Sequence, residues 1–376
     1  MIDLKDIRVE IDAIDKQIQE LFEKRMVLTS QVADYKLATG KAVLDKARED
    51  SQMAVLRSRA SSEFNATSIQ EIYKLIIGIG RKYQYQKLAA SGRSEKLDFK
   101  QVDAIRTKGA RIVYQGVKGA YSYGAMLSFF GTDENSFCVA KWRDAMEALA
   151  NDQADFAVLP IENSTAGSVY DNYDLLKEYN MHIVGEEVIK CEHVLMGIPG
   201  TKLEEIKYVY SHPQALAQCY TYLHQHDEWK RMQYSNTAAA AMMVANEKDK
   251  TQAAIASPFA AEVYGLEILA RDIYDNRDNS TRFIIVTKRK VYQKDAKKIS
   301  ICIELPHESG SLYNILSHII FNSLNMTKIE SRPIYEKNWE YRFFIDFEGN
   351  LNDSAVQNAL CGIEQEASWL RIIGNY

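Results

Sequence analysis

The sequence predicts a multidomain protein with an all-α amino-terminal segment, an open α/β middle segment and an α+β carboxyl-terminal segment. Over the first forty residues, apolar side chains recur at alternating steps of three and four, which is typical of a helix that packs against other helices. From residue 109 onward, short β-rich runs alternate with helical patterns. From Lys298 the pattern becomes βαββαβ, which indicates a ferredoxin-like unit.

Three helices are expected in residues 1–90. The first covers residues 4–39 and ends at Gly40, a typical C-cap residue. The second covers about 45–62 and the third about 67–88. The apolar stripe of the first helix consists of Leu4, Ile7, Ile11, Ile14, Ile18, Leu21, Leu28 and Val32. Three helices, one of them roughly 50 Å long, cannot enclose a core alone. We therefore expect a homodimer or a higher homo-oligomer.

Three cations lie on or beside this apolar stripe. Arg25 occupies the repeat itself, while Arg8 and Lys36 flank it. Burying a cation without a partner is costly, so the pattern favours a small anionic ligand. Arg25 and Lys36 are close to three turns apart and face the same way, whereas Arg8 lies roughly 25 Å further along the axis. Arg8 is then either structural or part of a second copy of the site on a partner chain. The alternative for each cation is a surface side chain that extends its charge into water.

Composition excludes several classes of function. The formal charge of −5 argues against nucleic-acid binding. Five scattered cysteines without CxxC spacing indicate reduced thiols in a cytoplasmic protein. The first ten residues are too charged for a signal peptide, and no apolar run approaches the ~20 residues of a membrane span. His224 and His226 lack a third ligand nearby, so no metal is expected; nor is a cofactor, because Gly116-x-x-Gly119 matches no nucleotide motif.

The middle segment contains candidate ligand-binding residues where its strands meet polar turns. Residues 91–108 are polar and predict a linker to an α/β domain over 109–290. Ligands bind such folds at the carboxyl ends of the strands. Four polar clusters follow or open the predicted strands, at Glu162-Asn163-Ser164, Ser211-His212-Pro213-Gln214, Ser235-Asn236-Thr237 and Thr281-Arg282. They predict a shared anion-binding cleft, and the alternative is that each cluster only caps a helix.

Over nearly its whole length the chain resembles the family of bifunctional chorismate mutase–prephenate dehydratases of phenylalanine biosynthesis. Residues 1–90 resemble the all-helical, dimeric chorismate mutase in the pattern Arg8, Arg25, Lys36, Asp45-x-x-Arg48-Glu49 and Gln84. Residues 109–290 resemble the dehydratase, which has a periplasmic-binding-protein-like fold, in GVKGAYS at 116–122, PIENSTAG at 160–167, SHPQAL at 211–216 and STRF at 280–283. Residues 297–376 resemble an ACT regulatory domain in GSL at 310–312 and ESRP at 330–333.

The resemblance implies how a mutase site would act. Chorismate rearranges by a pericyclic shift, so an enzyme needs to hold a compact conformer and stabilise charge on the breaking ether oxygen. Arg25, Arg48 and Arg8 of the partner subunit would bind carboxylates. Lys36 and Gln84 would donate hydrogen bonds to the ether oxygen, and Glu49, with Asp45 nearby, would accept the substrate hydroxyl. The alternative for Asp45, Arg48 and Glu49 is an ordinary surface ion-pair cluster on one helical face.

The resemblance also implies a dehydratase site and an effector site. Thr281 would protonate the departing hydroxyl of prephenate with help from a neighbour or a water, and Arg282 would lie alongside. His212 is either an acid or a helix cap. The expected cleft-lining residues are Asn163, Ser164, Ser211, Gln214, Ser235 and Thr237. L-Phenylalanine, as feedback inhibitor, would bind Gly310, Ser311, Leu312, Glu330, Ser331, Arg332 and Pro333.

The sequence departs from the family pattern at one position, and two alternatives to the bifunctional enzyme remain. Gly80 stands where relatives often have Ser, in a Gly78-Ile79-Gly80 stretch that weakens a helix by about 1 kcal/mol per Gly. A substrate contact could therefore be lost, leaving an enzyme with dehydratase activity alone. The other alternative is a non-catalytic amino-acid sensor, which would give the helical cations no role.

Overall fold

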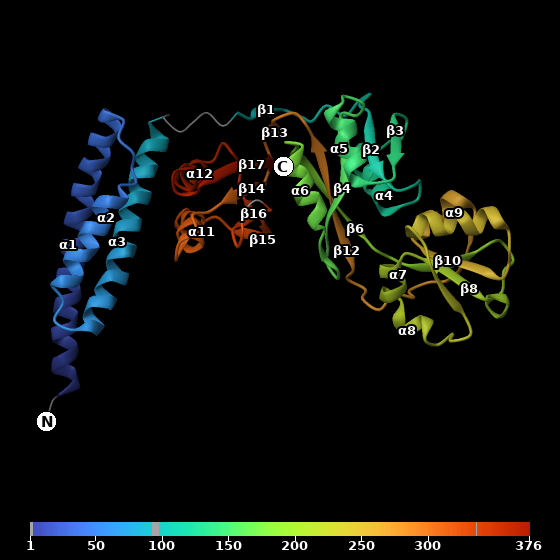
Figure 1. Ribbon diagram of the computed structural model, residues 1–376, viewed down its shortest axis with the longest axis horizontal. Helices are drawn as coiled ribbons and strands as arrows, with labels where there is room; N and C mark the ends of the chain where they lie inside the picture. Colours follow the sequence, from blue (N-terminus) through green and yellow to red (C-terminus); the bar gives the residue numbers. More distant parts are fainter. Residues whose placement is uncertain (1–2, 92–97, 336) are drawn as a thin grey trace. The chain divides into compact units, whose positions relative to one another are not determined.

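A computed structural model gives the structure of the chain and describes residues 3–91, 98–335 and 337–376. The chain divides into two compact units (Figure 1). The first unit consists of Met1–Asp98 and Lys297–Ile372, and the second of Phe99–Ala296 and Ile373–Tyr376. Residues 92–97 of the expected linker lie outside the described residues, but residues 100–102 of that linker form a strand, which the sequence did not predict.

The amino-terminal part of the first unit consists of the three expected helices. They are α1 (Leu4–Thr39), α2 (Lys46–Ser58) and α3 (Glu63–Ala90). The predicted bounds of α1 are confirmed, and Gly40 ends it in the left-handed conformation with φ 71°. The side chains of Asp3, Asp45 and Ser62 cap the three helix starts by accepting backbone N–H bonds. Local capping chemistry therefore sets the helix boundaries.

The apolar stripe of α1 is largely exposed to solvent within one chain. Leu4, Ile14, Ile18 and Leu21 each keep more than half of their surface accessible. Only Thr29 and Ala33 of this helix are buried, where its second half packs on α3. The stripe therefore finds no cover in its own unit among the described residues, as expected of a helix that pairs with another copy.

The carboxyl-terminal part of the first unit has the predicted βαββαβ order. Its elements are β14 (Lys298–Glu304), α11 (Ser311–Phe321), β15 (Met326–Pro333), β16 (Tyr341–Glu348), α12 (Ser354–Glu366) and β17 (Trp369–Asn375). The strands follow the order β15-β16-β14-β17, in which β16 is antiparallel to both β15 and β14. This is the strand order of a ferredoxin-like unit.

The first sheet of the second unit has the order β6-β12-β4-β2-β3, with β5 added to β4. Its elements in chain order are β2 (Ile112–Gln115), α4 (Tyr121–Phe130), β3 (Ser136–Val139), α5 (Trp142–Ala150), β4 (Phe156–Asn163), β5 (Gly167–Ser168), α6 (Tyr170–Glu178), β6 (His182–Lys190) and β12 (Ser280–Thr287). A short parallel pair, β1 (Lys100–Val102) and β13 (Val291–Gln293), accompanies it. Phe156, Val158 and Ile285 belong to its fully buried core.

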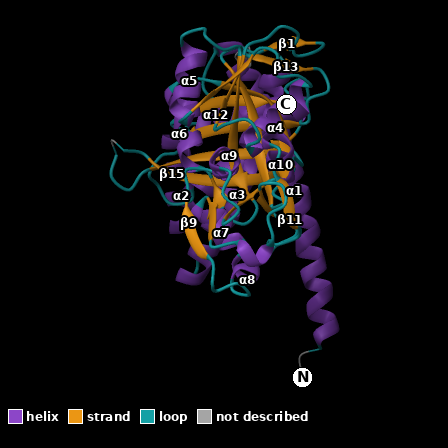
Figure 2. Cartoon of the chain, turned by 90° about the vertical axis from the view of Figure 1, so that its right-hand side faces the viewer, coloured by secondary structure: helices purple, strands orange, loops and turns teal. Residues whose placement is uncertain are grey.

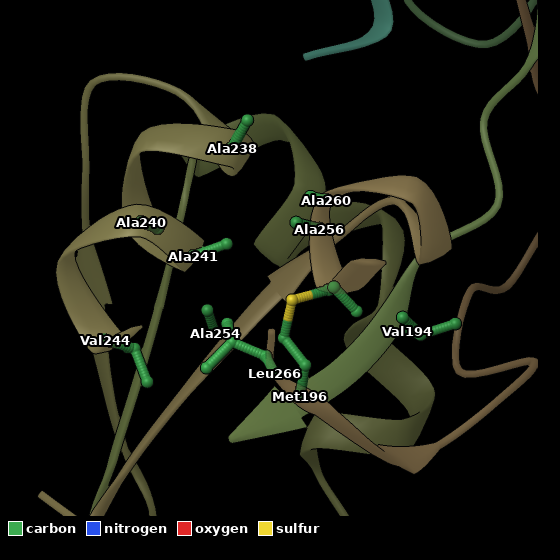
Figure 3. Packing of buried hydrophobic residues seen from close by; sticks show 11 residues of the cluster. Val194, Met196, Ala238, Ala240, Ala241, Val244, Ala254, Ala256, Ala260 and Leu266 are labelled. Carbon is green, nitrogen blue, oxygen red and sulfur yellow. The ribbon is translucent and has the colours of Figure 1, made fainter. Parts of the chain in front are cut away.

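The second sheet of this unit has the order β11-β7-β10-β8-β9. Its elements are β7 (Val194–Gly197), the 3₁₀ turn η1 (Leu203–Glu205), β8 (Tyr208–Ser211), α7 (Pro213–Gln218), α8 (Tyr220–Leu223), β9 (Lys230–Gln233), α9 (Thr237–Glu247), β10 (Gln252–Ala256), α10 (Pro258–Tyr264) and β11 (Glu267–Ala270). Alanines of α9 pack on β10 and β7 (Figure 3). Small side chains there let the helix approach the sheet closely.

The chain passes between the two sheets of the second unit twice, from β6 to β7 and from β11 to β12. Helices and strands alternate along most of the second unit. Figure 2 distinguishes helices from strands by colour. β12 runs antiparallel to both β4 and β6. The start of β12 therefore lies beside the end of β4. In the described part of the chain, no helix is long and apolar enough to cross a membrane.

Candidate active sites

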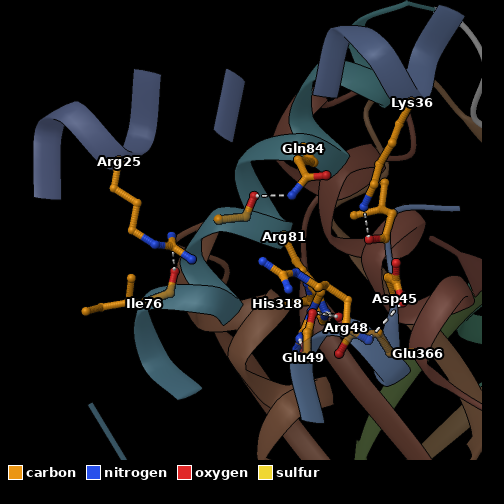
Figure 4. A network of polar contacts seen from close by, with 12 residues as sticks. Arg25, Lys36, Asp45, Arg48, Glu49, Ile76, Arg81, Gln84, His318 and Glu366 are labelled. Carbon is orange, nitrogen blue, oxygen red and sulfur yellow. Dashed lines mark hydrogen bonds and ion pairs between the residues drawn. The ribbon is translucent and has the colours of Figure 1, made fainter. Parts of the chain in front are cut away.

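Arg25 and Lys36 are half-buried on the face of α1 that meets the rest of its unit, not extended into solvent (Figure 4). Arg25 Nη1 donates to the carbonyl of Ile76 on α3 at 3.5 Å. Lys36 Nζ donates to the carbonyl of Val43, just before α2, at 2.6 Å. Burial lowers the pKa of Lys36, although Asp45 and Glu49 partly oppose this effect. Both cations are thus held by backbone carbonyls and turned toward the other helices.

Gln84 and Gly80 face α1 one turn apart on α3. Gln84 is buried, and its Nε2 donates to the Gly80 carbonyl at 3.3 Å. Its Oε1 is buried without a hydrogen-bond partner among the described residues. A Cβ at Gly80 would lie 3.4 Å from Thr29 Cγ2 and 3.5 Å from Arg25 Nη1, which is ordinary contact. Gly80 is therefore not required by packing, and a Ser would bring its hydroxyl near Arg25.

The start of α2 carries the expected acidic and basic residues in unequal environments. Asp45 is the N-cap and accepts the backbone N–H of Arg48 at 3.1 Å. Arg48 is exposed, whereas Glu49 is partly buried and forms an ion pair with Arg81 of α3. The alternative of a mere surface cluster thus does not describe Glu49.

Arg81 neighbours these residues, although the sequence did not single it out. Its Nε lies 2.9 Å from Glu366 Oε1 on α12, and the same oxygen lies 3.3 Å from His318 Nε2 on α11. Burial would lower the pKa of Arg81, but Glu366 and Glu49 outweigh it and raise that pKa. Burial would likewise raise the pKa of Glu366, but His318 and Arg81 lower it overall. The sequence signal that could have identified Arg81 is its position as a cation about one helical turn before Gln84.

Arg8 is exposed near the start of α1, on the part of the helix that extends beyond the packed region. The neighbouring Ile7 and Ile11 are also exposed. Arg8 does not join the other mutase-like residues within one chain, because the helix axis separates them as its ~1.5 Å rise per residue dictates.

In the second unit, the structure joins the ends of two predicted clusters through Asn163 and Thr281. Cα register pairs these two residues across β4 and β12. Asn163 Nδ2 donates to Thr281 Oγ1 at 2.9 Å and to Asn279 Oδ1 at 2.8 Å. Asn163 Oδ1 accepts the backbone N–H groups of Thr165 and Ala166. The Asn163 amide is thereby fixed in orientation, and a register shift after Arg282 marks a β-bulge beside it.

Cys191 is a further neighbour of Thr281 that carried no sequence signal. It follows β6, and its Sγ lies 3.1 Å from Thr281 Oγ1. Burial raises the pKa of Cys191, so the thiol keeps its proton near neutral pH. The Thr281 hydroxyl is thus surrounded by an amide donor and a protonated thiol.

Arg282 and Ser164 serve the sheet and the turns around this cluster. Arg282 points to the opposite face from Thr281, as strand alternation requires, and pairs with Glu162 and Glu186, each at 3.2 Å. This differs from the expectation that Arg282 binds substrate alongside Thr281. Ser164 Oγ accepts the backbone N–H of Ser280 at 3.0 Å and donates to the Asp278 carbonyl. Ser164 therefore ties the turn after β4 to the start of β12.

The remaining predicted lining residues lie on the second sheet. β8, β9 and β10 are parallel, so the helices that follow them all begin at one edge of this sheet. Gln214, Ser235 and Thr237 lie at this edge, where Asn236 caps α9 by accepting the Ala239 N–H at 2.7 Å. Ser211 is an exception, because its hydroxyl is fully buried and donates to the Ile255 carbonyl. This position differs from the prediction that Ser211 lines the cleft.

His212 caps a helix, which is one of the two roles predicted for it. Its Nδ1 accepts the backbone N–H of Gln214 at 3.2 Å, which caps α7. Burial lowers the pKa of His212 and so favours the neutral ring that can accept this bond.

The expected effector residues lie around the start of α11 and along β15. Gly310 has φ 85° and begins α11, a conformation that favours glycine. Ser311 and Leu312 line a cavity of about 430 Å³ together with Tyr341 and Phe343 of β16. In the β15–β16 pairing, Ser331 lies opposite Phe343 and Pro333 opposite Tyr341. Glu330 and Arg332 alternate with them on the same strand.

A second cavity in the first unit, of about 470 Å³, lies between the helices and α11. Its lining includes Glu49 and Arg81 on one side and Gly310, Ser311 and Glu366 on the other. The expected mutase and effector residues thus border one space.

Comparison with known families and proteins follows the same division of the chain. Residues 7–85 match the family model of type II chorismate mutase, and residues 112–291 match that of prephenate dehydratase. The bifunctional chorismate mutase/prephenate dehydratase of Buchnera aphidicola is 32% identical over 382 residues, which covers 100% of this chain and 96% of that protein.

Two further proteins match part of the chain. Arogenate dehydratase/prephenate dehydratase 2 of Arabidopsis thaliana is 40% identical over 277 residues, covering 71% of this chain and 72% of that protein. The crystal structure of prephenate dehydratase in complex with L-Phe from Arthrobacter aurescens aligns with a TM-score of 0.65 and 32% identity, covering 71% of this chain and 89% of that one.

Proposed function

The chain belongs to the family of bifunctional chorismate mutase/prephenate dehydratases, and from this premise we propose which of its residues carry each activity. The enzyme converts chorismate to prephenate and prephenate to phenylpyruvate, two steps of phenylalanine biosynthesis. The observation that carries the assignment is that full-length similarity includes both segments and both candidate sites. Its thiols are free in the described residues, which fits the cytoplasmic location that we propose.

The mutase reaction is assigned to the cluster on α1, α2 and α3. Breaking the ether bond of chorismate places negative charge on its oxygen, and N–H donors held in a partly dry site stabilise that charge. Lys36 and Gln84 are the proposed donors to this oxygen. Each now donates to a backbone carbonyl, a contact that substrate would replace. Glu49 accepts the substrate hydroxyl, and Arg25 and Arg48 bind carboxylates.

A second copy of the chain completes this site. The exposed stripe of α1 would be covered by the same helix of a partner, as in an isologous interface. An antiparallel arrangement would bring Arg8 of the partner subunit to the site that it cannot reach in its own chain. We therefore propose a homodimer as the minimal active mutase.

The dehydratase reaction is assigned to the cluster around Thr281. Loss of the carboxylate as CO₂ supplies the electron pair that forms the aromatic ring, and the departing hydroxyl takes a proton to leave as water. Thr281 would give that proton. Its oxygen accepts a hydrogen bond from Asn163, and we assign the Cys191 thiol as a second donor. Two accepted hydrogen bonds stabilise the developing alkoxide, which makes Thr281 a better acid.

Binding of the substrate carboxylates is assigned to the edge of the second sheet. Gln214, Ser235 and Thr237 lie there beside the N-terminus of α9, whose free N–H groups and dipole favour anions. Asn163 would contribute from the first sheet, where its amide is already fixed. Ser164 and Arg282 would support the cluster from the surrounding turn and sheet.

The carboxyl-terminal βαββαβ segment is proposed to be an ACT domain that binds L-phenylalanine. The cavity lined by Ser311 and Leu312 has room for a small amino acid, and Gly310, the N-cap of α11, directly precedes these two residues. Its other wall, Phe343, pairs with Ser331 of the ESRP motif. The likeness to a prephenate dehydratase structure solved with L-Phe supports this ligand. Gly310→Ala should weaken inhibition by phenylalanine; equal inhibition of the variant and the parent would refute this site.

Arogenate is a second candidate substrate for the dehydratase site. The similarity to arogenate dehydratase/prephenate dehydratase 2 favours this, because it extends over 71% of this chain. Arogenate differs from prephenate by an amino group in place of the keto group, so the same ring chemistry applies. Comparing kcat/KM for the two substrates decides which one the site prefers.

One assay tests the two activities together. Chorismate is supplied to the purified chain, and ultraviolet absorbance follows chorismate loss and phenylpyruvate gain. We expect both. Chorismate consumption without phenylpyruvate would refute the dehydratase activity. Phenylpyruvate that forms only from added prephenate would refute the mutase activity. If neither chorismate loss nor phenylpyruvate gain occurs, the alternative of a non-catalytic amino-acid sensor holds.

A further inference from the structure

Arg81 occupies a position between two carboxylates that come from different parts of the first unit. Its Nη1 pairs with Glu49 of α2, and its Nε lies 2.9 Å from Glu366 of α12 (Figure 4). The side chains of Arg81 and Glu366 are 13% and 8% exposed, so this contact is largely shielded from water. His318 stands 3.3 Å from the same Glu366 oxygen and is itself buried.

We propose that Arg81 is a positioning residue of the mutase site, holding the Glu49 carboxylate ready for the substrate hydroxyl, and that Glu366 of the carboxyl-terminal segment holds Arg81 in turn. The inference rests on the proposed role of Glu49 as acceptor of that hydroxyl. It adds a residue on α3 and a residue on α12 to the determinants of chorismate binding.

The shape of the guanidinium explains why one side chain can do both. Its N–H groups lie in a rigid plane and point in fixed directions, so separate nitrogens bind separate carboxylates. With Glu366 bound at Nε, the remaining nitrogens can meet Glu49 in only a narrow range of orientations. Without Glu366, Arg81 regains its rotamers and Glu49 loses a fixed partner.

Charge balance leads to the same conclusion. Glu49 and Glu366 carry two negative charges, and Arg81 supplies one positive charge between them. If a neutral side chain replaces Arg81, the two carboxylates repel each other and Lys36 remains as a neighbouring cation for Glu49. Glu49 would then turn toward Lys36 and away from the substrate hydroxyl. It would also bind the Lys36 ammonium, which is the proposed donor to the ether oxygen.

The same geometry links the mutase site to the carboxyl-terminal segment. Glu49, Arg81 and Glu366 border the 470 Å³ cavity whose other lining residues include Gly310 and Ser311. A rearrangement of α11 or α12 that moves Glu366 therefore acts on Glu49 through one intervening side chain. Chorismate affinity should therefore depend on Glu366, which lies outside the three helices that carry the mutase site.

The experiment measures mutase kinetics of the full-length chain with substitutions at both ends of this link. Arg81→Met should raise the KM for chorismate about tenfold with a smaller change in kcat, because a hydroxyl contact is made in both the ground and transition states. Arg81→Lys should restore part of the loss, and Glu366→Gln should raise KM severalfold. Lys87→Met is the matched control, since Lys87 also joins α3 to another helix, through Asp34, but does not touch Glu49. Far-ultraviolet circular dichroism reports whether the helices of the first unit are folded in each variant, because the dehydratase site lies in the second unit and its kinetics do not report on them.

A double-mutant cycle separates this inference from the assignment of Glu49. In a Glu49→Gln background, Arg81→Met and Glu366→Gln should have little further effect on KM. Full additivity, or an unchanged KM in Arg81→Met and Glu366→Gln while Glu49→Gln is impaired, would overturn the positioning role alone. An unchanged KM in Glu49→Gln would refute the role of Glu49 and the inference with it.

Discussion

The amide of Asn163, at the end of β4, donates a hydrogen bond to the hydroxyl of Thr281, at the start of β12, over 2.9 Å. The two residues are more than a hundred positions apart and meet because β12 runs antiparallel to β4. The same amide is anchored by Asn279 and by two backbone N–H groups. The Thr281 hydroxyl is thereby held by the end of β4, and Asn279 in the turn before β12 helps to fix the same amide.

Thr281 should be required for one activity and not for the other. Thr281→Val removes the hydroxyl while keeping the branched shape, so dehydratase kcat should fall by about a hundredfold or more, the usual scale of general-acid catalysis. Mutase activity should not change. Thr281→Ser keeps a hydroxyl and should retain part of the rate; phenylpyruvate formation at the parental rate by Thr281→Val would exclude Thr281 from the mechanism.

Cys191 should assist Thr281 by hydrogen bonding. Cys191→Ala leaves the Thr281 oxygen with one donor fewer, so dehydratase kcat should fall by about tenfold, and Cys191→Ser should recover much of it because a hydroxyl can donate the same bond. Cys219→Ala is the control, since that thiol is also buried but lies in the core of the second sheet. Equal kinetics for Cys191→Ala and the parent would show that the thiol only fills space.

The exposed stripe of α1 should mediate dimerisation and, through it, mutase activity. Ile14→Asp places a charge in the middle of the stripe, so the dimer should dissociate and mutase kcat/KM should collapse while the dehydratase remains active. Val9→Asp is the matched control, because Val9 is exposed on the opposite face of the same helix. Analytical ultracentrifugation reads the assembly state, and a dimer that survives Ile14→Asp would exclude this face.

Replacing Gly80 should stabilise the first unit. Gly80→Ala improves helix propensity by about 1 kcal/mol, and its Cβ meets Thr29 and Arg25 at ordinary contact distances. Gly78→Ala offers the same propensity gain where the Cβ meets nothing within 4 Å, and so controls for packing. Denaturant unfolding measures both. A loss of stability in Gly80→Ala but not in Gly78→Ala would mean that the packing of α1 on α3 requires residue 80 to have no side chain.

Mutase activity should fall at alkaline pH because of Lys36. The protonated ammonium is the donor to the ether oxygen, and burial lowers the pKa of Lys36 below its ordinary value of 10.5. As pH rises through that lowered pKa, the free enzyme loses the proton, so kcat/KM for chorismate should decline before an exposed lysine would titrate. Lys36→Arg should move the decline to higher pH, since guanidinium stays charged. A parental profile that is flat up to pH 10.5 would contradict this assignment.

Much of the architecture could be predicted from local patterns. The bounds of α1, the βαββαβ order after residue 297 and the alternation of strands and helices in the second unit follow from periodicity, caps and turns, which act between residues close in sequence. The segment 100–102 was missed because a three-residue strand has too little pattern of its own and depends on pairing with β13.

The family membership was also determined by the sequence alone, because motifs of charged and polar residues persist in linear order. What only the tertiary structure decided is which of these groups meet. Antiparallel pairing brings Thr281 to Asn163 and Cys191, strand alternation turns Arg282 toward two glutamates, and the packing of α12 places Glu366 on Arg81. Such contacts join residues distant along the chain, and their energies depend on burial and on orientation in space, which no local pattern records.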